Sequence, residues 1–108
     1  MPLPPALSPE QRQAALDKAA AARRQRAELK EKLKMGSVSL PELFSQAEND
    51  EVIGKMKMLA VLESLPGVGK VKARRLMEKV DISESRRVRG LGRQQRERLL
   101  EELSAPAS

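Results

Sequence analysis

Two pairs of glycines, each enclosing one aliphatic residue, constrain how the second half of this chain can fold. They lie in Leu65-Pro66-Gly67-Val68-Gly69-Lys70 and in Gly90-Leu91-Gly92. Each pair precedes a run with the apolar periodicity of a helix, so each predicts a turn at a helix start. Backbone N–H groups that crowd ahead of a helix suit an anion. Region 65–103 therefore predicts two turns suited to phosphate.

The helix after the first pair is expected to have one apolar and one strongly basic face. Its expected buried residues are Val68, Val71, Ala73, Leu76 and Val80, and its expected outward cations are Lys70, Lys72, Arg74, Arg75 and Lys79. Ser83 can cap a short helical turn that carries Arg86, Arg87 and Arg89. The last helix, from Arg93 to Leu103, would bury Leu99, Leu100 and Leu103.

The first half of the chain predicts a long basic helix. Ser8 is a capping residue followed by Pro9, and Gln11 completes a capping box. Gly36 ends the helix, which holds eight basic and four acidic residues within 9–35. Its apolar residues Leu16, Leu29 and Leu33 are too sparse for a broad core stripe, so much of its length should be solvated. Arg23, Arg24 and Arg26 follow a run of alanines and form a narrow cationic stretch, which we expect to contact a polyanion such as DNA in addition to region 65–103. The alternatives are a surface helix held by i,i+4 ion pairs or a coiled-coil arm.

Between these regions the pattern favours two core helices. Ser39 begins a short one that turns Leu40, Leu43 and Phe44 inward. Asn49 or Asp50 then caps one continuous helix, whose expected core residues are Val52, Ile53, Met56, Leu59, Ala60 and Leu62. No period-two run of β-branched residues indicates a strand, so the fold class is all-α. The expected parts are a flexible leader (1–8), a long basic helix (9–35), a compact domain (39–103) and a flexible tail (104–108).

Composition narrows the function further. The chain has a net charge of +6, and Lys70–Arg98 alone holds eleven basic and four acidic residues, which favours a polyanionic partner. It has no His, Cys or Tyr, so we expect neither an enzyme nor a metal or cofactor site. A P-loop is excluded because Ser64 and Val71 stand where it needs glycine and Ser or Thr. No apolar run is long enough to span a membrane, and we expect a cytoplasmic protein. Phe44 is the only aromatic residue, which argues for duplex rather than single-stranded nucleic acid.

These motifs resemble a known family. PGVGKxxA resembles the hairpin of helix-hairpin-helix modules, and SLPGVGKVKARRLMEK, ISESRRVRGLG, NDEVIGKMK and LSPEQRQAALDKAAAARRQRAELK resemble the actinobacterial integration host factors. The resemblance covers nearly the whole chain and implies a helix-two-turns-helix module at 65–103. It departs from the family after Gly92, where Arg93-Gln94-Gln95-Arg96 replaces a Ser-Asn-Gln start.

The resemblance also implies a function. It implies a monomeric, nucleoid-associated protein that binds and bends double-stranded DNA with little sequence preference and assists phage integrase or recombination complexes. The residues expected at DNA are Gly67, Val68, Gly69, Lys70, Lys72, Arg74, Arg86, Arg87, Arg89, Gly90, Gly92, Arg93 and Gln94. The alternative is a structural module that binds RNA or the ribosome, or a recombinase accessory subunit.

Overall fold

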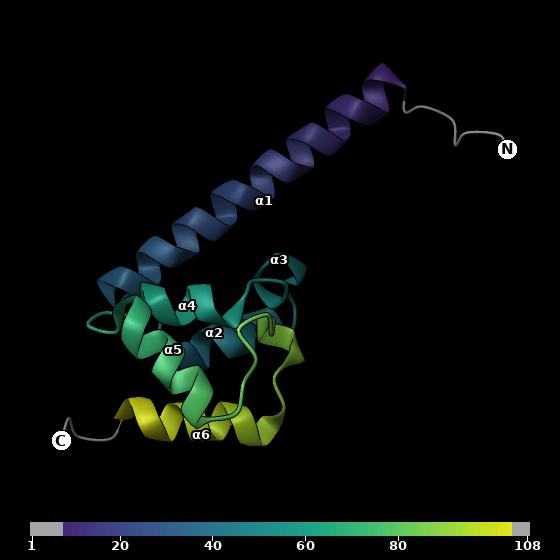
Figure 1. Ribbon diagram of the computed structural model, residues 1–108. Helices are drawn as coiled ribbons and strands as arrows, with labels where there is room; N and C mark the ends of the chain where they lie inside the picture. The colour runs from purple at the N-terminus through teal and green to yellow at the C-terminus, as the bar shows by residue number, and fades with distance from the viewer. Residues whose placement is uncertain (1–7, 105–108) are drawn as a thin grey trace, which may run out of the picture.

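The computed structural model describes residues 8–104 and has the expected all-α fold. Figure 1 shows one long helix lying across a compact group of shorter ones. In chain order the elements are α1 (Pro9–Met35), α2 (Leu40–Ala47), α3 (Glu51–Gly54), α4 (Met58–Ser64), α5 (Gly69–Lys79), the 3-10 helix η1 (Val88–Gly90) and α6 (Arg93–Ser104). The predicted leader and tail fall, apart from Ser8 and Ser104, outside the described residues.

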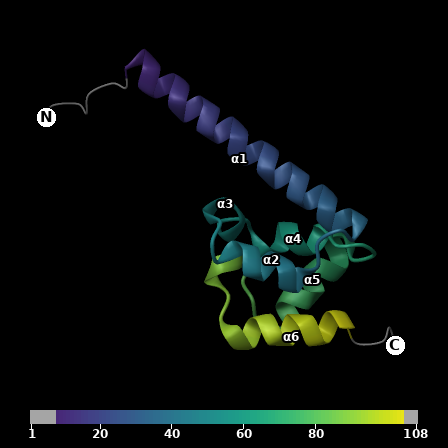
Figure 2. The ribbon, with the colours of Figure 1, turned by 180° about the vertical axis from the view of Figure 1, so that it is seen from behind.

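Helix α1 begins and ends where the sequence predicts. Ser8 accepts a hydrogen bond from the Gln11 backbone N–H (3.1 Å), and the Gln11 side chain accepts one from the Ser8 N–H (2.9 Å). Gly36 ends the helix in the left-handed conformation. Leu16 is exposed, but Leu29 and Leu33 are buried in the core. The C-terminal part of α1 therefore belongs to the compact body, and its N-terminal part extends away from it, as Figures 1 and 2 show.

The core is apolar, mostly aliphatic, and combines side chains from every helix and from the 3-10 turn. Phe44 is buried as predicted. The largest fully buried side chains are Leu33, Leu43, Met58, Leu62, Met77, Leu99, Val61, Val80 and Val88. Val71 was expected inside but is 66% exposed. The buried face of α5 centres on Ala73, Leu76 and Met77. Positions separated by two residues in sequence lie about 200° apart around a helix, so Val71 points away from Ala73 and faces solvent.

The single helix predicted after Asp50 is wrong, because the structure breaks it into α3 and α4. Asp50 does cap α3 through the Val52 N–H (3.0 Å). The chain then extends at Lys57, which pairs with Arg87 in an isolated antiparallel bridge. The Met58 N–H donates to the Arg86 carbonyl and the Val88 N–H to the Met56 carbonyl, each at 2.9 Å. These inter-segment bonds replace helical bonds, so long-range pairing overrides the local periodicity.

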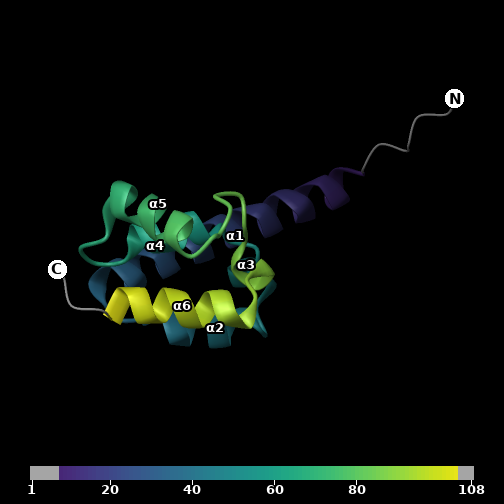
Figure 3. The same cartoon turned by 60° about the horizontal axis from the view of Figure 1, so that its bottom comes forward.

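Helix α6 spans the body and separates the two glycine turns (Figure 3). The first turn lies near the C-terminal end of α6, where Leu65, Pro66 and Val68 share an apolar groove with Leu100 and Leu103. The second turn directly precedes the N-terminal end of α6. The 12 residues of α6 extend about 18 Å, so the two turns lie toward opposite ends of a helix of that length.

Candidate nucleic-acid interface

The first glycine turn has the backbone that an anion needs. Gly67 and Gly69 both take positive φ, +74° and +70°. The Val68 N–H donates to the Leu65 carbonyl (3.3 Å), whereas within residues 8–104 no hydrogen bond uses the N–H of Gly67 or Gly69. Helix α5 starts here without a side-chain cap. Its first N–H groups are open and carry the positive end of the helix dipole.

The second glycine pair has the same sequence pattern but a different structure. Neither Gly90 nor Gly92 takes positive φ. The Gly90 N–H donates to the Arg87 carbonyl (2.9 Å) and the Leu91 N–H to the Val88 carbonyl (3.3 Å). The Gly92 N–H donates to Gln95 Oε1 (3.0 Å). These amides are already bonded inside the protein, so the two turns are not equivalent anion sites.

Gln95 connects this second turn to the end of α5, a role that the sequence analysis did not predict. Besides accepting from Gly92, its amide nitrogen donates to the Asp81 carbonyl (3.3 Å). Asp81 is left-handed, with φ of 59°. The Arg96 N–H donates to the Gly92 carbonyl (3.1 Å), so Gly92 occupies the N-cap position. The signal was a Gln three residues after the cap, as in a capping box.

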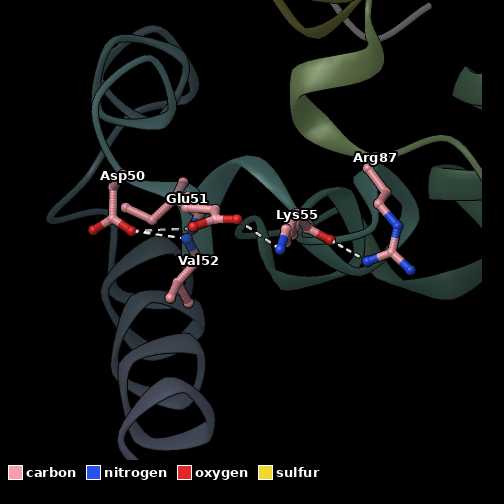
Figure 4. Close-up of polar contacts among 6 residues, drawn as sticks. Asp50, Glu51, Val52, Lys55 and Arg87 are labelled. Carbon is pink, nitrogen blue, oxygen red and sulfur yellow. Dashed lines mark hydrogen bonds and ion pairs between the residues drawn. The ribbon is translucent and has the colours of Figure 1, made fainter. Parts of the chain in front are cut away.

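The three arginines between the turns are all exposed, but they point to different neighbours. The Arg86 guanidinium donates to the Gly90 carbonyl, four residues further along the chain (3.4 Å). Arg87 donates to the Lys55 carbonyl at 2.6 Å, as Figure 4 shows. Arg89 packs on Gly54, where an added Cβ would lie 3.3 Å from its Cδ. The structure therefore does not gather them into one cluster.

The remaining predicted cations differ in whether an acidic side chain pairs with them. Arg74 pairs with Glu84 (3.6 Å) and Arg93 with Glu97 (3.3 Å), both at exposed positions where an ion pair contributes little. Lys70 and Lys72 are exposed and form no ion pair with any residue that the structure describes. Gln94 is exposed on α6. Lys70 and Lys72 thus lie in the first turn of α5, directly after the open amides, and are exposed.

A groove that the sequence analysis did not foresee runs between α1 and the body. One part, about 580 Å³, joins the first glycine turn to Lys30 and Lys34 of α1. The next part, about 320 Å³, lies beside the first and shares Lys30 and Ala60 with it. The second part is called the basic cleft below. Its charged residues are Arg26, Lys30, Lys55, Lys57 and Arg87.

The groove rearranges the predicted second patch on α1. Arg23 and Arg24 are exposed, whereas Arg26 is half-buried and lines the basic cleft. Lys30 and Lys57 were not among the expected site residues. The spacing of Arg26 and Lys30 by four residues on one helix was the available signal, but only the tertiary fold places Lys57 opposite them.

Glu51 lies beside Lys55, one of the cations of the basic cleft. Its carboxylate pairs with Lys55 at 2.7 Å (Figure 4). The hydrogen bond and charge of Lys55 lower the pKa of Glu51, and the charges of Lys18 and Arg89 lower it further. Glu51 therefore stays ionised and offsets part of the local positive charge.

Residues 8–104 hold no group of acidic, His or Cys side chains that could bind a metal ion. None of the helices in this range is long and apolar enough to cross a membrane.

Comparison with known proteins identifies the family. Residues 33–103 match the family described as "S13-like H2TH domain". The chain is 64% identical to the integration host factor of Streptomyces coelicolor over 95 residues, which are 88% of each protein. It is 56% identical to that of Mycobacterium tuberculosis over 101 residues, 94% of this chain and 96% of the relative.

A solved structure agrees with these matches. It is described as "Structure of sIHF bound to an 8bp palindromic DNA" and superimposes with a TM-score of 0.77 at 59% identity. The match covers 80% of this chain and 97% of the solved one. The chain therefore belongs to the actinobacterial integration host factor family, as its motifs predicted, and carries that family's helix-two-turns-helix domain.

Proposed function

We propose that this protein is a nucleoid-associated protein that binds duplex DNA with little sequence preference and bends or compacts it. Through bending it would influence DNA topology, recombination and transcription. The observation that carries the proposal is the open, left-handed turn at Gly67 and Gly69, in a chain 59% identical to a protein solved on DNA. It acts as a binding protein, not as an enzyme.

In this proposal one phosphate binds at the first turn. The N–H groups of Gly67 and Gly69 donate to its oxygens, and the dipole of α5 favours the negative charge. Lys70 and Lys72 neutralise the same strand. A glycine at each position lets the backbone approach closely, because no Cβ stands between the amides and the phosphate.

The second turn binds through side chains, because its amides are used internally. Arg86, Arg89 and Arg93 are exposed around it and can each donate to phosphate. The pair between Arg93 and Glu97 is exposed and easily exchanged for a phosphate. Because the two turns lie toward opposite ends of α6, they would place two phosphate contacts at different points of the duplex.

Recognition in this proposal is largely independent of sequence. Contacts to phosphates position a protein on DNA but read no bases. Any preference would come from DNA deformability or groove width. A second contact at Arg23, Arg24 and Arg26 on α1 would let a monomer bend DNA. We also propose residence on the nucleoid in the cytoplasm, and phage integrase or recombination complexes as partners.

The test is a salt titration of binding to a short duplex of arbitrary sequence, followed by fluorescence anisotropy. The logarithm of affinity should fall linearly with the logarithm of salt concentration, by about 0.9 for each phosphate neutralised. Lys70→Gln with Lys72→Gln should reduce that slope by about 2. An affinity that is flat with salt would contradict the proposal. Tighter binding to duplex RNA than to duplex DNA would favour the alternative of an RNA-binding module.

A further inference from the structure

Val71 is an apolar side chain in the middle of the basic face of α5, and it is 66% exposed. Lys70 and Lys72 precede and follow it in the sequence. Arg74 and Arg75 come three and four residues later, which places them beside Val71 on the helix surface. All four cations are exposed. Val71 is therefore an apolar centre surrounded by positive charge.

The packing of α5 does not account for a valine at this position. The buried side of the helix is filled by Ala73, Leu76 and Met77, and Val71 points away from it. A β-branched residue also forms a helix less readily than the Lys and Arg residues around it. Val71 thus contributes little to folding, and what distinguishes it is its place on the surface.

Helix geometry sets the direction of the Val71 side chain. Cα–Cβ bonds in an α-helix tilt toward the N-terminal end, which in α5 follows the first glycine turn. Val71 is the third residue of α5, so its own N–H is among those without a partner inside the helix. Its methyl groups therefore lean toward the amides to which the proposed function assigns a phosphate.

A strand that places a phosphate on this turn also places a sugar beside it, because phosphates and sugars alternate along the strand. When Lys70 and Lys72 neutralise the same strand, the surface between them that meets the sugar is Val71. Deoxyribose presents only C–H groups at C2′, whereas ribose presents a hydroxyl there. A hydroxyl pressed against methyl groups loses its water and gains no hydrogen bond. An apolar contact at this point therefore suits DNA better than RNA.

We propose that Val71 packs on a deoxyribose beside the phosphate bound at the first glycine turn and makes this surface prefer duplex DNA to duplex RNA. The inference rests on the proposed function and adds to it a contact that carries no charge. The lysines and arginines make binding depend on salt. Val71 contributes affinity that does not depend on salt, because burial of apolar surface releases no counterion.

The experiment compares Val71→Thr with Val71→Ile in the intact protein. Threonine has a helix propensity similar to that of valine but replaces a methyl group by a hydroxyl, whereas isoleucine keeps the apolar contact. Fluorescence anisotropy follows binding to a duplex DNA and a duplex RNA of the same sequence at several salt concentrations. Val71→Thr should bind DNA about three- to tenfold more weakly with the salt slope of the parent, and Val71→Ile should stay within about twofold of the parent.

The RNA measurements separate a sugar contact from a general loss of binding. The affinity of Val71→Thr for RNA should change by less than about twofold, so its preference for DNA falls by the factor lost on DNA. Both variants should melt like the parent, because the position is exposed. Unchanged DNA binding by Val71→Thr, an equal loss on DNA and RNA, or a smaller salt slope would each overturn the proposal. The proposed function fails on a different result, a parent affinity that is flat with salt.

Discussion

Lys57 and Arg87 face each other across the one isolated antiparallel bridge found in residues 8–104. The bridge ties the segment between α3 and α4 to the segment before η1. Arg87 adds a side-chain bond to the Lys55 carbonyl at 2.6 Å. The bridge lies at the break between α3 and α4, and it brings Lys57 and Arg87, which are distant in the sequence, to one cleft.

Arg87 should therefore matter for stability as well as for charge. Arg87→Ala removes the bond to Lys55 and should lower the free energy of unfolding by about 0.5–1.5 kcal/mol. Arg86→Ala is the matched control, because its bond to Gly90 is 3.4 Å long and exposed. Urea denaturation of the two variants measures the difference. Equal stabilities would mean that the Arg87 bond contributes nothing.

Gly67→Ala should destabilise the protein through backbone strain. A left-handed backbone costs a residue with a Cβ about 1–2 kcal/mol, although open space surrounds the position. The melting temperature should fall by roughly 4–8 °C per kcal/mol. DNA affinity should fall as well, because the turn presents the amides.

Gly92→Ala is the matched control for this strain. Its φ is not positive, and an added Cβ would meet only Gln95 Oε1 at 3.7 Å, an ordinary contact. Its melting temperature should fall less than that of Gly67→Ala, because alanine at the N-cap of α6 loses only a cap preference and no left-handed strain is added. If both glycine variants melt alike, the two turns do not differ as the structure indicates.

Much of this architecture could be predicted from local sequence. Ser8, Gln11, Gly36, Ser39 and Asp50 act where the capping rules place them, because caps depend on neighbours in the chain. The all-α class followed from apolar periodicity for the same reason. Local rules therefore gave the bounds of α1 and the start of α2 and α3.

What could not be predicted depends on contacts between distant segments. The periodicity from Val52 to Leu62 fits one helix, but the chain breaks at Lys57, where it pairs with Arg87 from a distant segment. The two Gly-X-Gly motifs read alike, yet Gln95 satisfies one of them from the following helix. The basic cleft needs α1 to lie over Lys57, which no local pattern encodes.

Gly54 is one of these tertiary positions, and Gly54→Ala should destabilise the body. An added Cβ would lie 3.3 Å from the Ala47 carbonyl oxygen and 3.3 Å from Arg89 Cδ. Overpacking of this kind costs typically about 1–3 kcal/mol, against about 1 kcal/mol gained in helix propensity. Thermal unfolding in an Arg89→Ala background provides the control. The loss should persist there, because the carbonyl contact remains; complete rescue would place the clash on Arg89 alone.

Glu51 gives a pH-dependent prediction. Its pKa is lowered from the ordinary 4.5, so its pairing with Lys55 contributes stability above that value and loses it as pH falls through the lowered pKa. Glu51→Gln should abolish this part of the acid dependence. The melting temperatures of parent and variant, compared between pH 7 and about pH 3, should converge at the acid end. A difference that is constant with pH would contradict the assignment.

The last prediction concerns bending. The molecule is 59 Å long and α1 alone extends about 40 Å, so Arg23 and Arg24 offer a second contact well away from the glycine turns, which a duplex that curves along the arm would meet. Contacts at both ends would offset an elastic cost on the order of 1–6 kcal/mol. Deleting α1 is a poor test, because Leu29 and Leu33 are part of the core. Arg23→Gln with Arg24→Gln leaves the core intact and should bind DNA but compact it less in a single-molecule assay, whereas Arg12→Gln with Lys32→Gln should compact it nearly as the parent does. Equal compaction by the two variants would confine bending to the compact body and leave α1 as a solvated arm.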